Sequence, residues 1–320
     1  MKLPDISLEH LQTRLFRWAS DPDIPMSYIE WELERYLSWV AIPHVTLDKI
    51  PLLRARPNDG KKKFHSLNDL SYPPDAQKIR FARANYEQEQ VFYAALVSKR
   101  HLESRRLDSG QTTAVMEVGA DFATRIHEPS ALFTVGSWYL SQPVNAYVLP
   151  FTSLSFAAYH DFNWLNLLFY NELEKICKGN YERFAYSLSF LNFMSDVFCQ
   201  QHAKYVHYRI SAPFFKALMK LKLPLAASGL IYPSANTNAQ GMNIVLPKEL
   251  VDDGTIQKPY SVIMYIAERQ KNKQMIELRP YSFQTRPKEN GYFNCKVKVN
   301  KKNEDVQSNV AKFNPSTSIK

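Results

Sequence analysis

The sequence predicts an α+β protein, because its helical and strand-like segments come in separate blocks along the chain. Hydrophobic residues fill 45% of the 320 positions, which is enough apolar material for one large core or two small ones. Charged residues make up 22%, an ordinary fraction that argues against a globally disordered chain.

The first predicted block is helical and spans residues 8–40. Ser27, with Glu30 three residues later, has the form of a capping box before the run WELERYLSWV. The apolar residues of this run would supply a face for the core, and we expect Trp31 and Trp39 to pack into it. The sequence therefore predicts an N-terminal helical extension over residues 1–45.

Strands dominate the next block. The run IPLLRAR (residues 50–56) predicts a strand that ends at Pro57, and VFYAALV (91–97) predicts another after an irregular stretch over 57–83. The runs FTVGSW and NAYVLPF predict two strands around a turn at Gln142 and Pro143. Between these pairs, TTAVMEV fits a strand or a helix start by periodicity, and Ser109 and Thr112, as available caps, favour the helix.

The third block, residues 163–222, is predicted to be mostly helical. One helix should end at Gly179, a second is apolar nearly all round, and a third should begin with Ser211 as cap and Pro213 in its first turn. Strands return with NIVL, followed by a hairpin of SVIMYIAE and MIELRPYSF. Few large apolar residues follow Arg286, so we expect residues 286–320 to form a basic, partly disordered tail.

Charge and cysteine content narrow the classes of partner and compartment. The formal net charge is +9, and more than half of it falls between Arg286 and Lys320, where eight Lys/Arg face three acids. The three cysteines are far apart and form no CxxC pair, which suits a reducing compartment. No run of about 18 apolar residues and no signal-peptide core is present. We expect a cytoplasmic protein with no membrane partner.

Several common motifs are absent from the sequence. There is no GxGxxG after a strand, no GxxxxGK[ST], no HExxH and no GxSxG, and the eight histidines show no metal-ligand spacing. The run KVKVNKK (Lys296–Lys302) could contact phosphates, but no set of stacking aromatics accompanies it. The sequence therefore predicts no metal site and gives little support for direct nucleic-acid binding.

A scattered set of polar residues lies within otherwise apolar short segments. Each member has an ordinary structural explanation, such as a charge at a strand edge, a solvated helix face or a turn. The set comprises Arg54 in PLLRAR, Arg83 and Asn85 in RAN, Glu117 in TTAVME and Ser234 in YPSAN.

In this order, the runs LLRAR, RANYEQEQVFYAA, TTAVMEV and GLIYPSANTNAQGMNIVLP resemble the RES family, which is named for its Arg, Glu and Ser. The resemblance covers about residues 46–282, and the last run is its most distinctive part. It implies an ADP-ribosyltransferase-like α+β fold over residues 46–285, with central β-sheets flanked by helices.

The resemblance also implies a function. Members of the family use NAD+ as substrate, without a further cofactor, and break the bond between nicotinamide and ribose by phosphorolysis or hydrolysis, or pass ADP-ribose to a protein. Many are toxins paired with an Xre-type antitoxin. We therefore expect NAD+ and inorganic phosphate as partners, with nucleic acid contacted only through an antitoxin.

Carried over residue by residue, the family's three named positions fall on Arg54, Glu117 and Ser234. Its second block falls on Arg83 and Tyr93. A carboxylate can stabilise the positive charge that grows on the ribose, and an Arg can grip phosphate oxygens with two hydrogen bonds. Three more residues beside these motifs are expected to contact the substrate: Asn85, Arg56 and Tyr232.

The second block departs from the family's pattern at two glycines. Ala82 replaces the first, and Gln88 or Glu89 stands where the second is expected. A tight turn or a close approach of the ligand could be altered there. These departures leave open a second interpretation, a catalytically weak protein that keeps the fold and binds NAD or another nucleotide.

Overall fold

The computed structural model describes most residues of the chain. They are 7–58, 63–98, 108–125, 127–151, 162–200, 205–221, 227–237, 241–270, 276–282, 285–296 and 311–313.

The strands within the described ranges form one mixed sheet. They are β1 (His44–Leu47), β2 (Leu52–Pro57), β3 (Val91–Leu96), β4 (Ser130–Leu140), β5 (Val144–Val148), β6 (Leu230–Pro233), β7 (Met242–Pro247), β8 (Ile256–Arg269), β9 (Ile276–Pro280) and β10 (Ala311–Phe313). Their order is β1-β5-β6-β7-β3-β2-β4-β8-β9-β10. The β5–β6 pair is parallel and the other neighbours are antiparallel.

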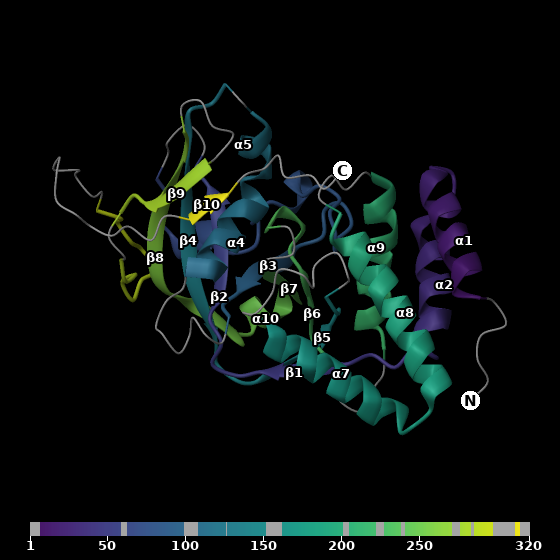
Figure 1. Ribbon diagram of the computed structural model, residues 1–320. Coiled ribbons are helices and arrows are strands. Elements are labelled where there is room, and N and C mark those ends of the chain that lie inside the picture. Colours follow the sequence, from purple (N-terminus) through teal and green to yellow (C-terminus); the bar gives the residue numbers. More distant parts are fainter. Residues whose placement is uncertain are drawn as a thin grey trace.

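Helices and short 3-10 turns accompany this sheet. The α-helices are α1 (Leu8–Ser20), α2 (Met26–Leu37), α4 (Asp108–Val118), α5 (Ala120–Thr124), α7 (Asn163–Cys177), α8 (Tyr181–Phe198), α9 (Tyr205–Met219) and α10 (Glu249–Asp252), with short 3-10 turns η2 (Leu67–Leu70), η3 (Ala76–Lys78) and η4 (Ala235–Thr237). Helices α1, α2, α8 and α9 gather on one side of the molecule, away from β8 and β9 (Figure 1). The predicted α+β class is therefore confirmed.

Two apolar cores hold these layers together. The larger joins side chains of α1, α2 and α7–α9 to one part of the sheet, and it includes the fully buried Leu11 and Leu15 of α1. The smaller lies between α4 and the sheet and contains Leu53, Ala95 and Val115. Because α1 and α2 contribute to the larger core, the N-terminal helices pack as part of the same body as the sheet.

Two expectations about the N-terminal helices were wrong. Helix α2 begins at Met26, with Pro25 at its N-cap position and no side-chain cap, so Ser27 lies inside the helix and forms no capping box. Trp31 is 57% exposed, with the guanidinium of Arg35 over its ring at 5.4 Å. The buried stripe is instead formed by Ile29, Leu33, Tyr36 and Leu37, whose spacing turns Trp31 toward solvent.

The third block also differs from expectation at its last helix. Helix α9 already includes Tyr205, so Ser211 and Pro213 lie in its interior and do not mark its start. A proline at that position loses one helical hydrogen bond. Burial of Ile210, Phe214 and Leu218 from the same helix offsets this loss, because these side chains are almost fully enclosed in the larger core.

Strand pairing confirms one expectation and refines another. Strands β8 and β9 pair in the predicted antiparallel hairpin. Strands β4 and β5 flank the predicted turn but do not pair with each other, since β4 lies between β2 and β8, and β5 lies between β1 and β6.

The C-terminal region is partly incorporated into the fold. Ala311–Phe313 forms β10 beside β9, and Phe293 and Cys295 are buried. The expected tail is otherwise described over residues 286–296, whereas residues 297–310, which hold most of the basic run Lys296–Lys302, and residues 314–320 lie outside the described residues. Among the helices that the structure describes, none combines the length and apolar character that crossing a membrane requires.

Candidate functional site

Glu117 lies in the last turn of α4, and close packing fixes that helix on the sheet. A Cβ atom at Gly110 would come within 2.8 Å of Leu53 Cδ1, so glycine lets the first turn of α4 lie directly on β2. The side chains of three residues of α4 are buried: Thr113, Ala114 and Val115. Helix α4 also contacts η4 and β7, and Glu117 in its last turn is half-buried.

Three side chains from the region of β6 and β7 donate hydrogen bonds to the Glu117 carboxylate. Ser234 Oγ donates to Oε1 at 2.5 Å, and Asn243 Nδ2 donates to the same oxygen at 2.7 Å. Asn236 Nδ2 donates to Oε2 at 3.0 Å. We call these four residues the Glu117 cluster. Three donors thus converge on one carboxyl group.

The loop that carries Ser234 is fixed by its own backbone. Ser234 N–H donates to the carbonyl of Gly241 at 2.8 Å, and Thr237 Oγ1 donates to the carbonyl of Ser234 at 3.3 Å. Gly241 packs against Thr113 of α4 so closely that a Cβ atom there would lie 2.1 Å from Thr113 Oγ1. Ser234 itself is 0% exposed. Its hydroxyl therefore positions Glu117 in this structure.

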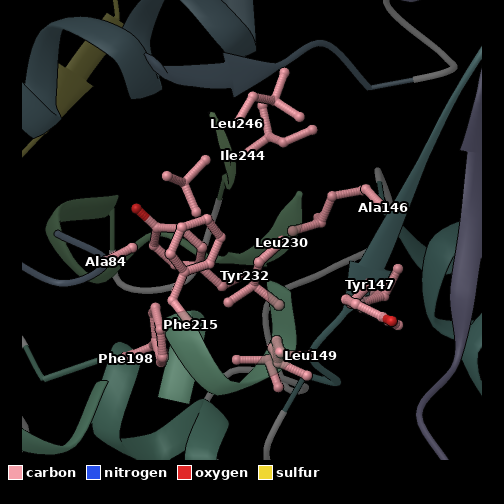
Figure 2. Close-up of a cluster of buried hydrophobic side chains, with 14 of the residues drawn as sticks. Ala84, Ala146, Tyr147, Leu149, Phe198, Phe215, Leu230, Tyr232, Ile244 and Leu246 are labelled. Carbon is pink, nitrogen blue, oxygen red and sulfur yellow. The ribbon is translucent and has the colours of Figure 1, made fainter. Parts of the chain in front are cut away.

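Two groups that interact electrostatically with Glu117 border the cluster: the buried Tyr232 and the half-buried Cys199. The Tyr232 ring lies 4.9 Å from the ring of Phe198, within the apolar cluster drawn in Figure 2. Burial, and then the neighbouring Tyr93 and Glu117, raise the pKa of Tyr232 well above its usual value. Burial also raises the pKa of the Cys199 thiol to about 12. Both groups are therefore neutral at physiological pH, and Cys199 is poorly suited to act as a nucleophile.

Tyr93 holds the turn of the second motif. Its hydroxyl accepts from Ala84 N–H at 2.9 Å and donates to Asn85 Oδ1 at 2.9 Å. Asn85 Nδ2 donates in turn to the carbonyls of Arg80 and Tyr86. Burial raises the pKa of Tyr93, so the hydroxyl keeps its proton. The predicted substrate contacts Tyr93 and Asn85 are thus committed to each other and to backbone.

Arg83 is placed beside this turn and at the end of α8. Its Nη1 and Nη2 donate to the carbonyls of Phe198 and Gln200 at 2.6 and 2.8 Å, and its guanidinium lies over the ring of Tyr208. Carbonyls at a helix C-terminus carry partial negative charge, so a cation is stabilised there. The charge of Arg83 also lowers the pKa of the nearby Tyr232 and Tyr93, against the larger effect of burial.

Arg54 and Arg56 lie apart from the Glu117 cluster. Arg54 Nε donates to the carbonyl of Ser71 at 3.1 Å and Nη1 to the carbonyl of Tyr93 at 2.7 Å. Its guanidinium lies over Phe92, on the opposite face of β2 from Leu53, because side chains alternate along a strand. Burial and then Arg56 lower the pKa of Arg54 to about 10, which leaves it charged at neutral pH.

Arg56 is held by a similar set of contacts. Its Nη1 donates to the carbonyl of Asp69 at 2.5 Å, and its guanidinium lies over Phe64. The structure thus joins Glu117 and Ser234 directly by a hydrogen bond. Tyr232 interacts electrostatically with Glu117, and Tyr93 and Arg83 interact in turn with Tyr232. Among the contacts of the described residues, neither Arg54 nor Arg56 reaches the cluster.

Sequence reasoning did not assign Asn236 and Asn243 to the site. Asn243 offered a readable signal, since it is the one polar residue in the strand run MNIVLP and is 4% exposed. A buried amide on an apolar strand needs hydrogen-bond partners, and Glu117 supplies one. Asn236 lies in η4, where a polar turn residue carries no such signal.

Gln88 stands at the expected glycine position and adopts φ of +64°. This left-handed conformation disfavours residues with a Cβ atom by about 1 kcal/mol, whereas glycine adopts it freely but loses more entropy on folding. We expect the free energy of unfolding to change by less than about 1 kcal/mol in Gln88→Gly and to fall by about 2 kcal/mol in Gln88→Val, because a β-branched residue is strained there.

Urea unfolding measures the free energies of unfolding of these two variants, with Glu87→Gly as the matched control. Glu87 is an exposed neighbour without a positive φ, so a glycine there should cost about 0.5–1 kcal/mol through chain entropy alone. Equal losses in Gln88→Gly and Glu87→Gly would contradict the argument.

Within the described ranges, no group of three or more His, Cys, Asp or Glu side chains could hold a metal ion. Comparison with protein-family models and with curated proteins gives no match to this chain. Function is therefore inferred from the geometry around Glu117.

Proposed function

We propose that this chain is an RES-like enzyme that consumes NAD+ by breaking the bond between nicotinamide and ribose. The observation that carries the proposal is the Glu117 carboxylate, fixed by Ser234, Asn236 and Asn243 at the junction of α4, β6 and β7. A carboxylate with a fixed orientation stabilises positive charge that develops beside it without having to reorganise.

The reaction makes few demands beyond such a carboxylate. The C–N bond to the anomeric carbon breaks, its electron pair leaves with nicotinamide, and the departing ring becomes neutral. The ribose carbon carries the transient positive charge, as in glycoside hydrolysis. An oxygen of phosphate or water then bonds to that carbon, and a water molecule's proton passes to solvent. Glu117 would stabilise the transient charge and accept a hydrogen bond from a ribose hydroxyl.

The arginines have donors left for the pyrophosphate of NAD+. A guanidinium carries five N–H donors. In Arg54 and in Arg83, two of the guanidinium nitrogens donate to backbone carbonyls. The donors that remain would bind phosphate oxygens. In the cell, we place this activity in the cytoplasm as that of a toxin held in check by an Xre-type antitoxin.

The test is release of nicotinamide from NAD+ by purified protein, followed by chromatography, with and without inorganic phosphate. Release that requires phosphate would identify phosphorolysis, and release without it would identify hydrolysis. Release only when a protein acceptor is added would identify ADP-ribosyl transfer. Intact NAD+ under all three conditions would rule out the proposal.

A second candidate is a protein that binds NAD or another nucleotide without turning it over. It is favoured by the commitment of Arg83, Tyr93 and Asn85 to backbone and to each other. Titration calorimetry with NAD+ distinguishes the two candidates, because this one predicts binding heat with no release of nicotinamide.

A further inference from the structure

Oxygen Oε1 of Glu117 has no acceptor capacity left. A carboxylate oxygen has two lone pairs, and Oε1 accepts from both Ser234 and Asn243. Oxygen Oε2 accepts only from Asn236 among the described residues, so one of its lone pairs remains. The two oxygens are therefore unequal, and the amide of Asn243 helps to make them so.

Asn243 is placed for this task by the sheet. It is the second residue of β7, which lies between β3 and β6, and it pairs with Ala95 on one side and Tyr232 on the other. Its side chain is 4% exposed, and an amide nitrogen can only donate. Glu117 arrives from a different element, α4, so the hydrogen bond ties the helix to the sheet at the carboxylate itself.

We propose that Asn243 is a positioning residue, which with Ser234 saturates Oε1 of Glu117 and leaves Oε2 as the oxygen that meets the ligand. The ligand group at Oε2 is a hydroxyl donor or a carbon that carries positive charge. This inference rests on the proposed function for the identity of the ligand, and it adds which oxygen acts and which residue selects it. Asn243 acts through Glu117 and does not touch the ligand.

The experiment compares Asn243→Leu with the wild type in steady-state NAD+ turnover. Leucine has the same number and branching of side-chain heavy atoms as asparagine but cannot donate, so Oε1 loses one partner and the carboxylate can rotate. We expect kcat to fall by about 10–100-fold, as when a residue that orients a catalytic group is removed, with KM changed by less than about 3-fold. Asn145→Leu on β5 is the control, since its amide accepts from Thr46 outside the cluster, and its kcat should stay at the wild-type level.

Asn243→Asp adds a readout that a merely structural role would not move. An ionised carboxylate at this position cannot donate and repels Glu117, whereas a protonated one can donate from the same place. Activity should therefore be lowest at neutral and alkaline pH and recover toward the wild type as pH falls. Tyr232 and Cys199 interact electrostatically with Glu117, and Tyr93, Arg83 and Asp196 interact in turn with one or both of these two groups. All five are common to the variant and the wild type.

A cycle of unfolding measurements separates failure of this inference from failure of the proposed function. If Asn243 holds Glu117, the loss of stability caused by Asn243→Leu should shrink in a Glu117→Ala background. Additive losses, an unchanged kcat in Asn243→Leu, or a rise in KM alone would each overturn the inference. If the wild type leaves NAD+ intact, the proposed function fails, and the cycle alone decides whether Asn243 positions Glu117.

Discussion

We expect Glu117→Gln to lower the rate of nicotinamide release from NAD+ by about 10²–10³-fold. A loss of this size is usual when one pre-placed electrostatic group is removed from an active site. The substitution keeps the size of the side chain but removes its negative charge. It also places an amide nitrogen against Asn243 or Asn236, both of which only donate through Nδ2. Charge and orientation are therefore lost together.

The control for this prediction is Asp121→Asn. Asp121 lies in α5, immediately after α4, and its carboxylate is 89% exposed. The substitution makes the same change in charge near the same helix, so turnover should remain at the wild-type rate. A fall in Asp121→Asn as large as that in Glu117→Gln, or full activity in Glu117→Gln, would show that Glu117 is not the reacting carboxylate.

Gly241→Ala should lower the free energy of unfolding by about 3 kcal/mol, at the upper end for overpacking a buried contact. The new Cβ atom would lie 2.1 Å from Thr113 Oγ1 and 2.9 Å from Thr113 Cβ, so α4 and the loop after β6 must move apart. Because Glu117 lies on that helix and Ser234 on that loop, turnover should fall as well. Urea unfolding and the nicotinamide assay measure the two effects.

Gly254→Ala is the matched control for Gly241→Ala. Gly254 has φ of +81°, and no atom lies within 4 Å of the position that a Cβ would take, so only the backbone conformation opposes an alanine, at about 1 kcal/mol. Thr113→Ala combined with Gly241→Ala should recover part of the lost stability, since it removes the nearest atom. A cost for Gly241→Ala no larger than that for Gly254→Ala would contradict the steric argument.

Local patterns were enough to find most strands of this fold and the helical nature of TTAVMEV. Helix α4 begins at Asp108, however, so the expected caps Ser109 and Thr112 lie inside it and do not mark its start. IPLLRAR, VFYAALV and NIVL are short apolar runs bounded by turn residues, and each forms a strand. Pairing was harder, because the turn between β4 and β5 looks like a hairpin locally while both strands find better partners elsewhere. The prediction that Trp31 is buried was wrong for a related reason. The face of α2 that is buried depends on its packing against α9, which lies far along the chain.

In the candidate site, too, single residues could be picked out from the sequence but most of their contacts could not. A family-like order of motifs was needed to connect Glu117 with Ser234, and their hydrogen bond is a tertiary contact that no local pattern could reveal. Asn243 was visible as a polar residue in an apolar strand, but its partner was not. Arg83 donates a hydrogen bond to the end of α8, more than 100 residues later in the sequence, so its role in holding that helix could not be predicted from local pattern.

The parallel pairing of β5 and β6 has a consequence for how the protein matures. Helices α7, α8 and α9 all lie between these two adjacent strands in the chain, and the hydrogen bond from Ser234 to Glu117 spans 117 positions. Closing a loop of that length costs entropy before any contact rewards it. A chain emerging during synthesis therefore carries Glu117 long before its hydrogen-bond partners exist, and the carboxylate is held in place only after β6 and β7 have been made and docked.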